Sequence, residues 1–287
     1  MNNFKKLLPV FCVAFVLASC DIFKGNEEEE VIQDPQNCDV VVDHVGYNLD
    51  LNKMTAEVAA INSTGAVEIP ESISASGKYF PVVSIGAFAA QNNQRLSSVK
   101  LPPSVAIIKK LAFNNCKALK EIDFGLGVET IQTEAFEFSG LTSLVIPTNV
   151  KTIAADAFLY CNSLTTITIN DSELPLDWNL KIGEYGLDEY ALSSIYIGRN
   201  VTAARTVPSS NIIIGKEVTK IGYLPVPTPI TIILETPIPP EASIATNNKA
   251  LMESLIYVPE EAVEVYQNDP TWGKFWNITV FSPDQQQ

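Results

Sequence analysis

The sequence predicts a β-rich solenoid of parallel strands with short helical or irregular returns, closed by an N-terminal β cap and a C-terminal cap containing a helix. Three observations predict it: an apolar motif that recurs about every 23 residues between Ile85 and Ile169, a turn-forming residue after most copies, and atypical sequence at both ends. A repeat of this length cannot bury its apolar side alone. Neighbouring repeats must therefore stack on one another.

Four copies of the motif share one internal spacing. Each opens with a leucine, and apolar residues follow three and five positions later, which is the alternation of a strand with one buried side. The leucines recur at steps of 23, 22 and 23, at Leu96, Leu119, Leu141 and Leu164. An alanine-phenylalanine pair recurs at steps of 25, 23 and 22, with its phenylalanines at Phe88, Phe113, Phe136 and Phe158. Turn-forming residues follow three of the strands, at Pro102, Gly125 and Pro147.

The pattern continues less regularly towards the C-terminus. Apolar pairs predict further strands, which end at Ile197, Ile214, Leu234 and Val258. The step from Ile169 to Ile197 is 28 residues, so we expect an insertion around 171–190 to bulge out of the stack. Prolines between 225 and 240 favour extended chain.

Both ends resemble caps, which keep the terminal apolar faces of a solenoid dry. At the front, strands are expected over 40–49 and 55–59, and a first rung over 67–70. At the back, Pro259 and two glutamates open a short helix through Tyr266. The last rung is expected to be covered by Trp272, Phe275, Trp276 and Ile278. The predicted domains are a signal peptide (1–19), an acidic tether (20–36), the N-terminal cap (37–80), a solenoid (81–258, regular over 81–170 and irregular over 171–258) and the C-terminal cap (259–287).

The first residues predict export and lipidation. Two lysines precede an apolar run that is too short to span a bilayer, and Leu17-Ala18-Ser19-Cys20 resembles a bacterial lipobox. Cys20 is therefore the predicted lipidation site, with an ordinary secretory peptide as the alternative. Three acyl chains would hold the protein on a membrane. The acidic run Glu27–Glu30 is either a signal for display on the outer face or a solvated linker. We expect a lipid-anchored outer-membrane protein on the cell surface, with a periplasm-facing orientation as the alternative.

The repeat pattern Leu-x-x-Ile-x-Ile-Pro-x-x-Val-x-x-Ile-x-x-x-Ala-Phe-x-x-Cys resembles the BspA-like, treponemal-type leucine-rich repeats of bacterial surface proteins. Full copies cover about residues 80–170, and the ending from Leu255 to Phe275 is also similar to that of the family. Proline or glycine stands at the strand ends, so we expect the asparagine ladder of common leucine-rich repeats to be absent. The resemblance implies adhesion to host matrix proteins or to other bacteria.

Composition and motifs argue against several function classes. A formal charge of −14 disfavours nucleic acid as a partner. His44 is expected to be a polar strand residue, and no cofactor or metal site is predicted. Cys116 and Cys161 share one repeat position two repeats apart, which predicts buried thiols without a disulfide. Glu134 and Asp156 also share a position, where acidic residues that open a helical turn are commoner than acid-base catalysts. The chain is not expected to be an enzyme.

The candidate binding surface is a column of outward strand residues. It begins with Lys100 and Asp123 and becomes apolar at Tyr196, Ile213, Ile233 and Tyr257. Such a strip is either a ligand-binding surface or a second core beneath the insertion or the C-terminal cap. The predicted function is non-catalytic binding, with adhesion to a host or bacterial surface protein first. The alternatives are a glycan-binding accessory of a polysaccharide-uptake system and an enzyme with an unrecognised site. If this strip binds a ligand, replacing Tyr196 and Tyr257 by alanine should leave the thermal stability of the protein nearly unchanged.

Overall fold

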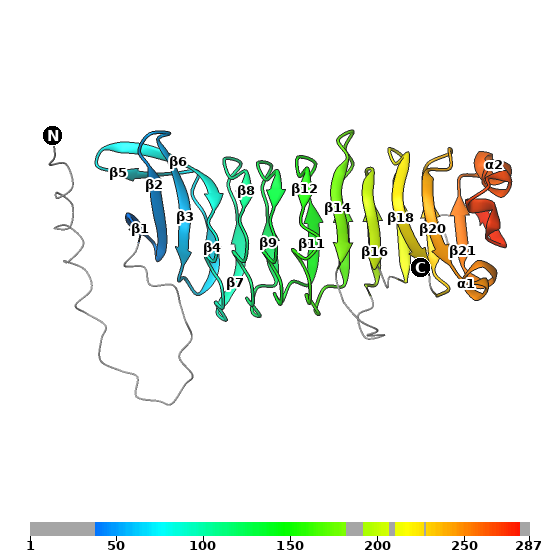
Figure 1. Cartoon of the computed structure of the whole chain (residues 1–287), viewed down its shortest axis with the longest axis horizontal. Helices are drawn as coiled ribbons and strands as arrows, with labels where there is room; N and C mark the ends of the chain where they lie inside the picture. The colour runs from blue at the N-terminus through cyan, green and yellow to red at the C-terminus, as the bar shows by residue number, and fades with distance from the viewer. Residues whose placement is uncertain (1–37, 182–191, 207–209, 227, 282–287) are drawn as a thin grey trace, which may run out of the picture. The chain divides into compact units, whose positions relative to one another are not determined.

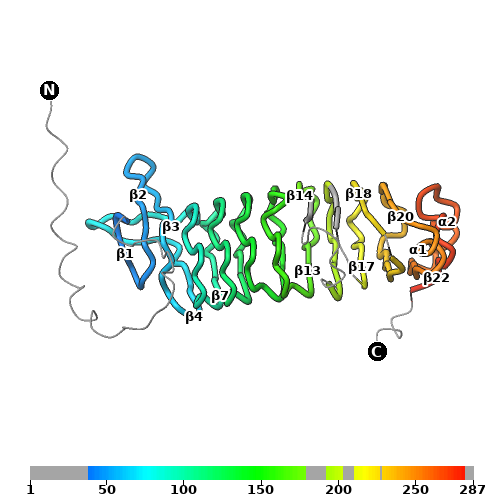
Figure 2. Tube along the Cα trace, turned by 60° about the horizontal axis from the view of Figure 1, so that its bottom comes forward, coloured from blue at the N-terminus to red at the C-terminus, as the bar shows by residue number. Residues whose placement is uncertain are grey.

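The computed structural model of the chain describes residues 38–181, 192–206, 210–226 and 228–281. The chain divides into two compact units, Met1–Val31 and Ile32–Gln287, and every described residue lies in the second. That unit is a solenoid whose coils contribute strands to two opposite sides, and Figures 1 and 2 show the coils stacked in sequence order. The signal peptide, Cys20 and the tether lie outside the described residues.

One side of the solenoid, called face A, carries the strands that follow the repeated leucines. It consists of a three-stranded and a seven-stranded parallel sheet. Its strands are β4 (Gly65–Glu68), β7 (Leu96–Lys100), β9 (Glu121–Asp123), β11 (Ser143–Ile146), β13 (Thr166–Ile169), β15 (Ser194–Ile197), β17 (Asn211–Ile214), β19 (Thr231–Leu234), β21 (Leu255–Val258) and β22 (Asn277–Val280). The predicted strands of the irregular region are thereby confirmed.

The opposite side, face B, is a twelve-stranded sheet built largely from the returns. The returns are more regular than expected, since each of them adds a parallel strand. The strands are β1 (Val40–Val42), β2 (Val45–Asp50), β3 (Thr55–Ile61), β5 (Ser72–Ala75), β6 (Lys78–Ile85), β8 (Ile107–Ile108), β10 (Thr130–Ile131), β12 (Thr152–Ile153), β14 (Leu176–Lys181), β16 (Val201–Thr206), β18 (Lys220–Val226) and β20 (Glu241–Thr246). Short helices are α1 (Asn248–Glu253), η2 (Glu260–Ala262), α2 (Val263–Asn268) and η3 (Trp272–Lys274).

An aromatic stack runs through the core between the two faces. The rings of Phe113, Phe136 and Phe158 lie nearly parallel, with centroids 5.0 and 5.1 Å apart, and Trp178 of β14 continues the stack at 5.7 Å. All four side chains are buried. The stack ends at Ala90, which holds the repeat position of Phe113 in the preceding coil and has no ring. The two residues share this position because the N–H of each donates to the equivalent carbonyl of its next coil.

The assignment of Phe88 to the repeated phenylalanine position is therefore wrong. Phe88 occupies the repeat position of Leu111, and it is only partly buried. The step of 25 residues from Phe88 to Phe113 was the sign of this error, since Ala90 to Phe113 restores the step of 23.

A polar ladder precedes the strands of face A. Asn93 Nδ2 donates to the carbonyls of Ile61 and Ser63, both at 3.0 Å. Two coils carry cysteine at the same repeat position: Cys116 Sγ lies 3.0 Å from the Ala90 carbonyl, and Cys161 Sγ lies 3.2 Å from that of Phe136. We expected no asparagine ladder, and this expectation is confirmed only in part. Asn93 makes the hydrogen bonds of such a ladder in one coil, whereas cysteine thiols stand at the same repeat position in two others. Both cysteines are buried and free of disulfides, as predicted.

The insertion after Ile169 is partly regular. The prediction that 171–190 bulges out is wrong for Leu176–Lys181, which forms strand β14 of face B, while 182–190 lie outside the described residues. Arg199 binds across this irregular coil and donates to the carbonyls of Pro147 at 2.8 Å and Thr148 at 2.6 Å. Arg199 is fully buried, and the two carbonyl dipoles compensate part of the desolvation of its charge, while its Nε–H has no hydrogen-bond partner within the described part of the chain.

The caps match the expectation in outline and differ in two side chains. His44 is in a turn and not in a strand, because Asp43 and His44, both with positive φ, form the two-residue connection between β1 and β2. At the back, Trp272, Phe275 and Ile278 are buried as predicted. Trp276 is not, since 69% of its surface is exposed.

We predict that Phe136→Ala lowers the free energy of unfolding by about 3–5 kcal/mol, because it opens a cavity between two stacked rings. Leu126→Ala in the same coil is the matched control, since Leu126 is exposed and its loss should change the free energy by less than about 0.5 kcal/mol. Urea unfolding followed by circular dichroism measures both values. Equal effects of the two substitutions would show that the aromatic stack does not hold the coils together.

Candidate functional site

The outward column of face A is present and in register. Thr168 pairs with Tyr196, Tyr196 with Ile213, Ile213 with Ile233, and Ile233 with Tyr257, so the four candidate residues lie on adjacent parallel strands. Their strand neighbours point inward and are buried, as the alternation of a strand requires. The predicted alignment of these residues on neighbouring strands is therefore confirmed, and their burial and contacts differ from one residue to the next.

Tyr196 is held in place by contacts within the chain. Its hydroxyl group donates to Asp171 Oδ1 at 2.7 Å, and its ring lies where a side chain at Gly215 would collide with it. Burial raises the pKa of Tyr196 above its usual value, with Asp171 and then Glu235 adding to the effect. A partly buried ring with a committed hydroxyl group serves packing more than ligand contact.

The two isoleucines are not exposed anchors either. Ile233 is buried, with 8% of its surface accessible, and Ile213 is half-buried between its strand neighbours. The centre of the predicted apolar column is thus closer to the second-core alternative than to a free binding strip.

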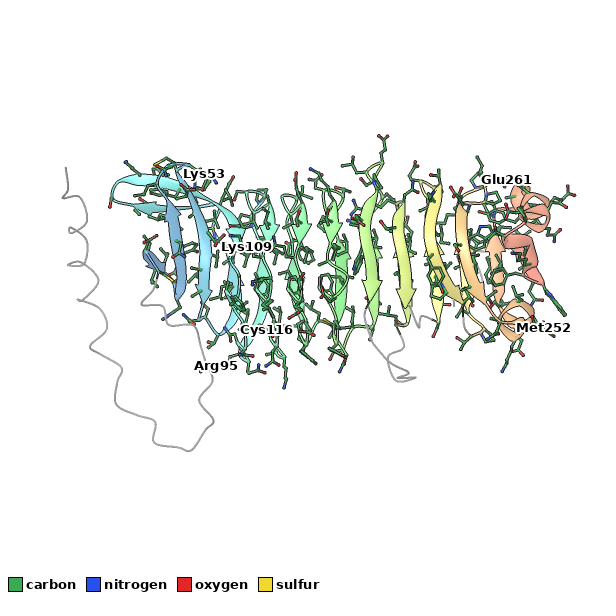
Figure 3. All side chains as sticks on the ribbon, viewed as in Figure 1. Lys53, Arg95, Lys109, Cys116, Met252 and Glu261 are labelled. Atoms are coloured by element: carbon green, nitrogen blue, oxygen red, sulfur yellow. The ribbon has the colours of Figure 1, made fainter. Side chains whose placement is uncertain are left out.

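Several apolar side chains at the C-terminal end of the solenoid are exposed or partly exposed. We call this group the distal patch and define it by Met252, Leu255, Tyr257, Trp276 and Phe281. Trp276 and Leu255 expose 69% and 41% of their surfaces, and the ring of Phe281 packs edge-on against Tyr257 at 6.3 Å. Main-chain pairing brings Trp276 to α1, since its N–H donates to the Leu251 carbonyl. Figure 3 shows Met252 at this end of the solenoid.

Trp276 is the functional candidate that the sequence analysis missed. The β21–β22 register puts it opposite Ser254, which is buried within the preceding coil. Trp276 belongs to the last described coil, so no further described coil covers it. Its exposure could have been suspected from the sequence, because Trp276 lies at the end of the recognisable repeats, where a side chain has a neighbouring coil on one side only.

The opposite end of the column is charged. Lys100 Nζ makes an ion pair with Glu68 Oε1 at 2.7 Å, and Asp123 lies beside Lys100 on the next strand. Farther along, Val145 is an isolated exposed aliphatic residue. This end offers no aromatic side chain in the column, which contrasts with the distal patch.

Catalytic and metal chemistry finds little support among the residues that the structure describes. No group of three potential metal ligands occurs there. Burial raises the pKa of Cys116 to about 12 and that of Cys161 to about 11, so these thiols stay protonated at neutral pH and are poor nucleophiles. No helix in the described part is long and apolar enough to cross a bilayer.

We predict that Tyr196→Phe lowers the free energy of unfolding by about 1 kcal/mol at pH 8, because the hydrogen bond to Asp171 is lost. The folded-state pKa of Tyr196 is raised, so this stabilisation is complete below pH ~10 and is lost as the pH rises beyond it. Tyr79→Phe, at an exposed tyrosine, is the control. Denaturant titrations between pH 7 and 11 measure the difference, and an effect no larger than that of Tyr79→Phe would contradict the assignment of Tyr196 to packing.

Comparison with known proteins places the repeats in a family. Residues 83–207 match the model described as BspA type leucine rich repeat region, in six copies. A leucine-rich repeat protein from Bacteroides capillosus is 27% identical, with a TM-score of 0.41 over 45% of this chain and 95% of that one. The T. pallidum leucine-rich repeat protein is 22% identical, with a TM-score of 0.47 over 61% and 85%. A leucine rich cell surface protein from Faecalibacterium prausnitzii is 17% identical, with a TM-score of 0.35 over 86% and 96%.

Among curated proteins, no significant match is found. The register of the coils, the buried repeat positions and the matched family model agree. Residues 83–207 are therefore a leucine-rich-repeat region of the BspA type.

Proposed function

We propose that this chain is a non-catalytic binding protein, lipid-anchored at the bacterial outer membrane, which adheres to a host or bacterial surface protein through the distal patch. The observation that carries the proposal is the exposure of Trp276, Leu255 and Met252 at the C-terminal end of the solenoid, where the Trp276 main chain pairs with that of Leu251. Tryptophan is enriched among the residues that dominate protein interfaces, and Trp276 has 69% of its surface free for such a contact.

The surroundings of the distal patch fit a protein interface. Energetically dominant interface residues are commonly tryptophan, tyrosine and arginine, surrounded by groups that contribute less but exclude water. A second outward column, two residues before the first on each strand, supplies polar side chains on the same face. Leu255 of the distal patch stands in this column, and its other members are Ser143, Thr166, Ser194, Asn211, Thr231 and Asn277.

The scaffold favours binding over catalysis. Strand β21 holds Leu255 and Tyr257 of the distal patch on paired backbone, so little conformational entropy is lost there when a partner docks. The raised pKa values of Tyr47, Tyr196 and Tyr266 all have burial as their largest cause, which is the pattern of structural groups and not of an acid-base pair.

We predict that Trp276→Ala combined with Leu255→Ala weakens binding about thirtyfold or more, because the pair supplies the apolar anchor. The midpoint of thermal unfolding should change little, since both side chains are exposed. The probes are immobilised extracellular-matrix proteins and a glycan array, each exposed to the mature chain.

The matched control is Lys100→Ala with Asp123→Ala at the other end of the same column, which should alter binding by no more than a few-fold. If the chain binds glycans and no matrix protein, the glycan-binding alternative is favoured over adhesion to a protein. If the variant Trp276→Ala with Leu255→Ala binds protein as well as the unsubstituted chain does, the distal patch is not the binding surface.

The anchor is tested separately. We predict that Cys20→Ala abolishes metabolic labelling with palmitate and moves the protein from the membrane to the soluble fraction, because acyl chains on Cys20 provide the attachment. Ser19→Thr, which keeps the cysteine, is the control. Palmitate labelling that persists in Cys20→Ala would contradict lipidation at this residue.

A further inference from the structure

One column of turn residues has left-handed backbone in four consecutive coils. Its members follow β6, β8, β10 and β12, and their φ angles are 63°, 56°, 57° and 58°, at Asn92, Asn115, Phe138 and Tyr160. Asparagine adopts this conformation readily, whereas bulky side chains adopt it at a cost of roughly 1 kcal/mol or more. The repeat thus favours asparagine, and two coils carry aromatic residues against that preference.

The two aromatic side chains form an exposed pair. Their rings stack with centroids 4.7 Å apart and an interplanar angle of 13°. Phe138 exposes 43% of its surface and Tyr160 is partly exposed, so burial does not compensate fully for the backbone strain. Strained residues whose cost the fold does not require are candidates for a functional role.

Three acidic residues belong to the same two turns as this pair. Glu137 precedes Phe138 directly, and Glu134 and Asp156 begin the same two turns. The pKa of Glu137 is raised by burial first and then by the charges of Glu134 and Asp156, which means that the three carboxyl groups lie near one another. In the described part of the chain, none of the three takes part in an ion pair, although Glu137 accepts a hydrogen bond from Asn114.

The same series of turns already holds a cation over an aromatic ring. Lys110 Nζ lies 5.4 Å from the centre of the Phe88 ring. Phe88 occupies the repeat position that Glu134 holds two coils later, so the geometry of these turns accommodates an ammonium group against an aromatic side chain. That contact is satisfied within the chain, whereas the Phe138–Tyr160 pair has no cation of its own among the described residues.

We infer that Phe138 and Tyr160, with Glu134, Glu137 and Asp156, form a second binding surface that receives an arginine side chain of a protein partner. The aromatic pair contacts the planar guanidinium group and its aliphatic stem, and the carboxylates complement its charge. The surface is separate from the distal patch and involves neither Trp276 nor Leu255. A negative result for this second surface would therefore not contradict the proposed adhesion through the distal patch.

The test uses a synthetic peptide of five Arg-Gly repeats and an analogue with citrulline, a neutral isostere, in place of arginine. Fluorescence anisotropy should show binding of the arginine peptide to the mature chain and at least about fivefold weaker binding of the citrulline peptide. Phe138→Asn with Tyr160→Asn should weaken arginine-peptide binding about fivefold or more. Its unfolding midpoint should not fall, since asparagine is the resident residue in two other coils.

Controls separate this surface from the general negative charge of the protein. Glu134→Gln with Glu137→Gln should weaken binding, whereas Glu260→Gln with Glu261→Gln, which removes the same charge from the C-terminal cap, should not. The exchange Phe138→Tyr with Tyr160→Phe should retain binding. Equal binding of the arginine and citrulline peptides, or full binding by the double asparagine variant, would overturn the inference.

Discussion

Every part of this structure depends on the inability of one coil to bury its own apolar side. A coil contributes a few inward side chains, and these become a core only when the next coil covers them. The aromatic stack from Phe113 to Trp178 is the clearest example, because each ring has its partner in the adjacent coil. Parallel hydrogen bonding on both faces then fixes the register, so that equivalent residues line up in columns.

The same constraint determines which surfaces are available for partners. Within the stack, an outward side chain lies between equivalents from two neighbouring coils, and Ile233 is almost covered in this way. Side chains outside this sandwiched arrangement are freer: Trp276 lies on the last described coil and exposes 69% of its surface, and Phe138 lies in a turn between strands and exposes 43%. The two proposed binding surfaces lie at these two places.

The sequence predicted what periodicity controls. The leucine spacing located the strands of face A, and the outward column followed from strand alternation with its members in the correct order. It did not predict that Ala90, and not Phe88, holds the phenylalanine position of the repeat, because the local pair Ala87-Phe88 resembles the repeat motif two residues too early. Neither Trp276 nor the Phe138–Tyr160 pair could be identified, because their exposure depends on which coil is last and on backbone angles that residue types alone do not specify.

Hydroxyl-radical footprinting of the mature chain, analysed residue by residue by mass spectrometry, tests most directly whether the coils stack as described. The account predicts rapid modification of Trp276 and Phe138, slow modification of Tyr196, and strong protection of Phe136, Trp178 and Trp272. Protection of Trp276 to the same degree as Trp272, together with rapid modification of Phe136, would contradict the coil register on which both binding surfaces rest.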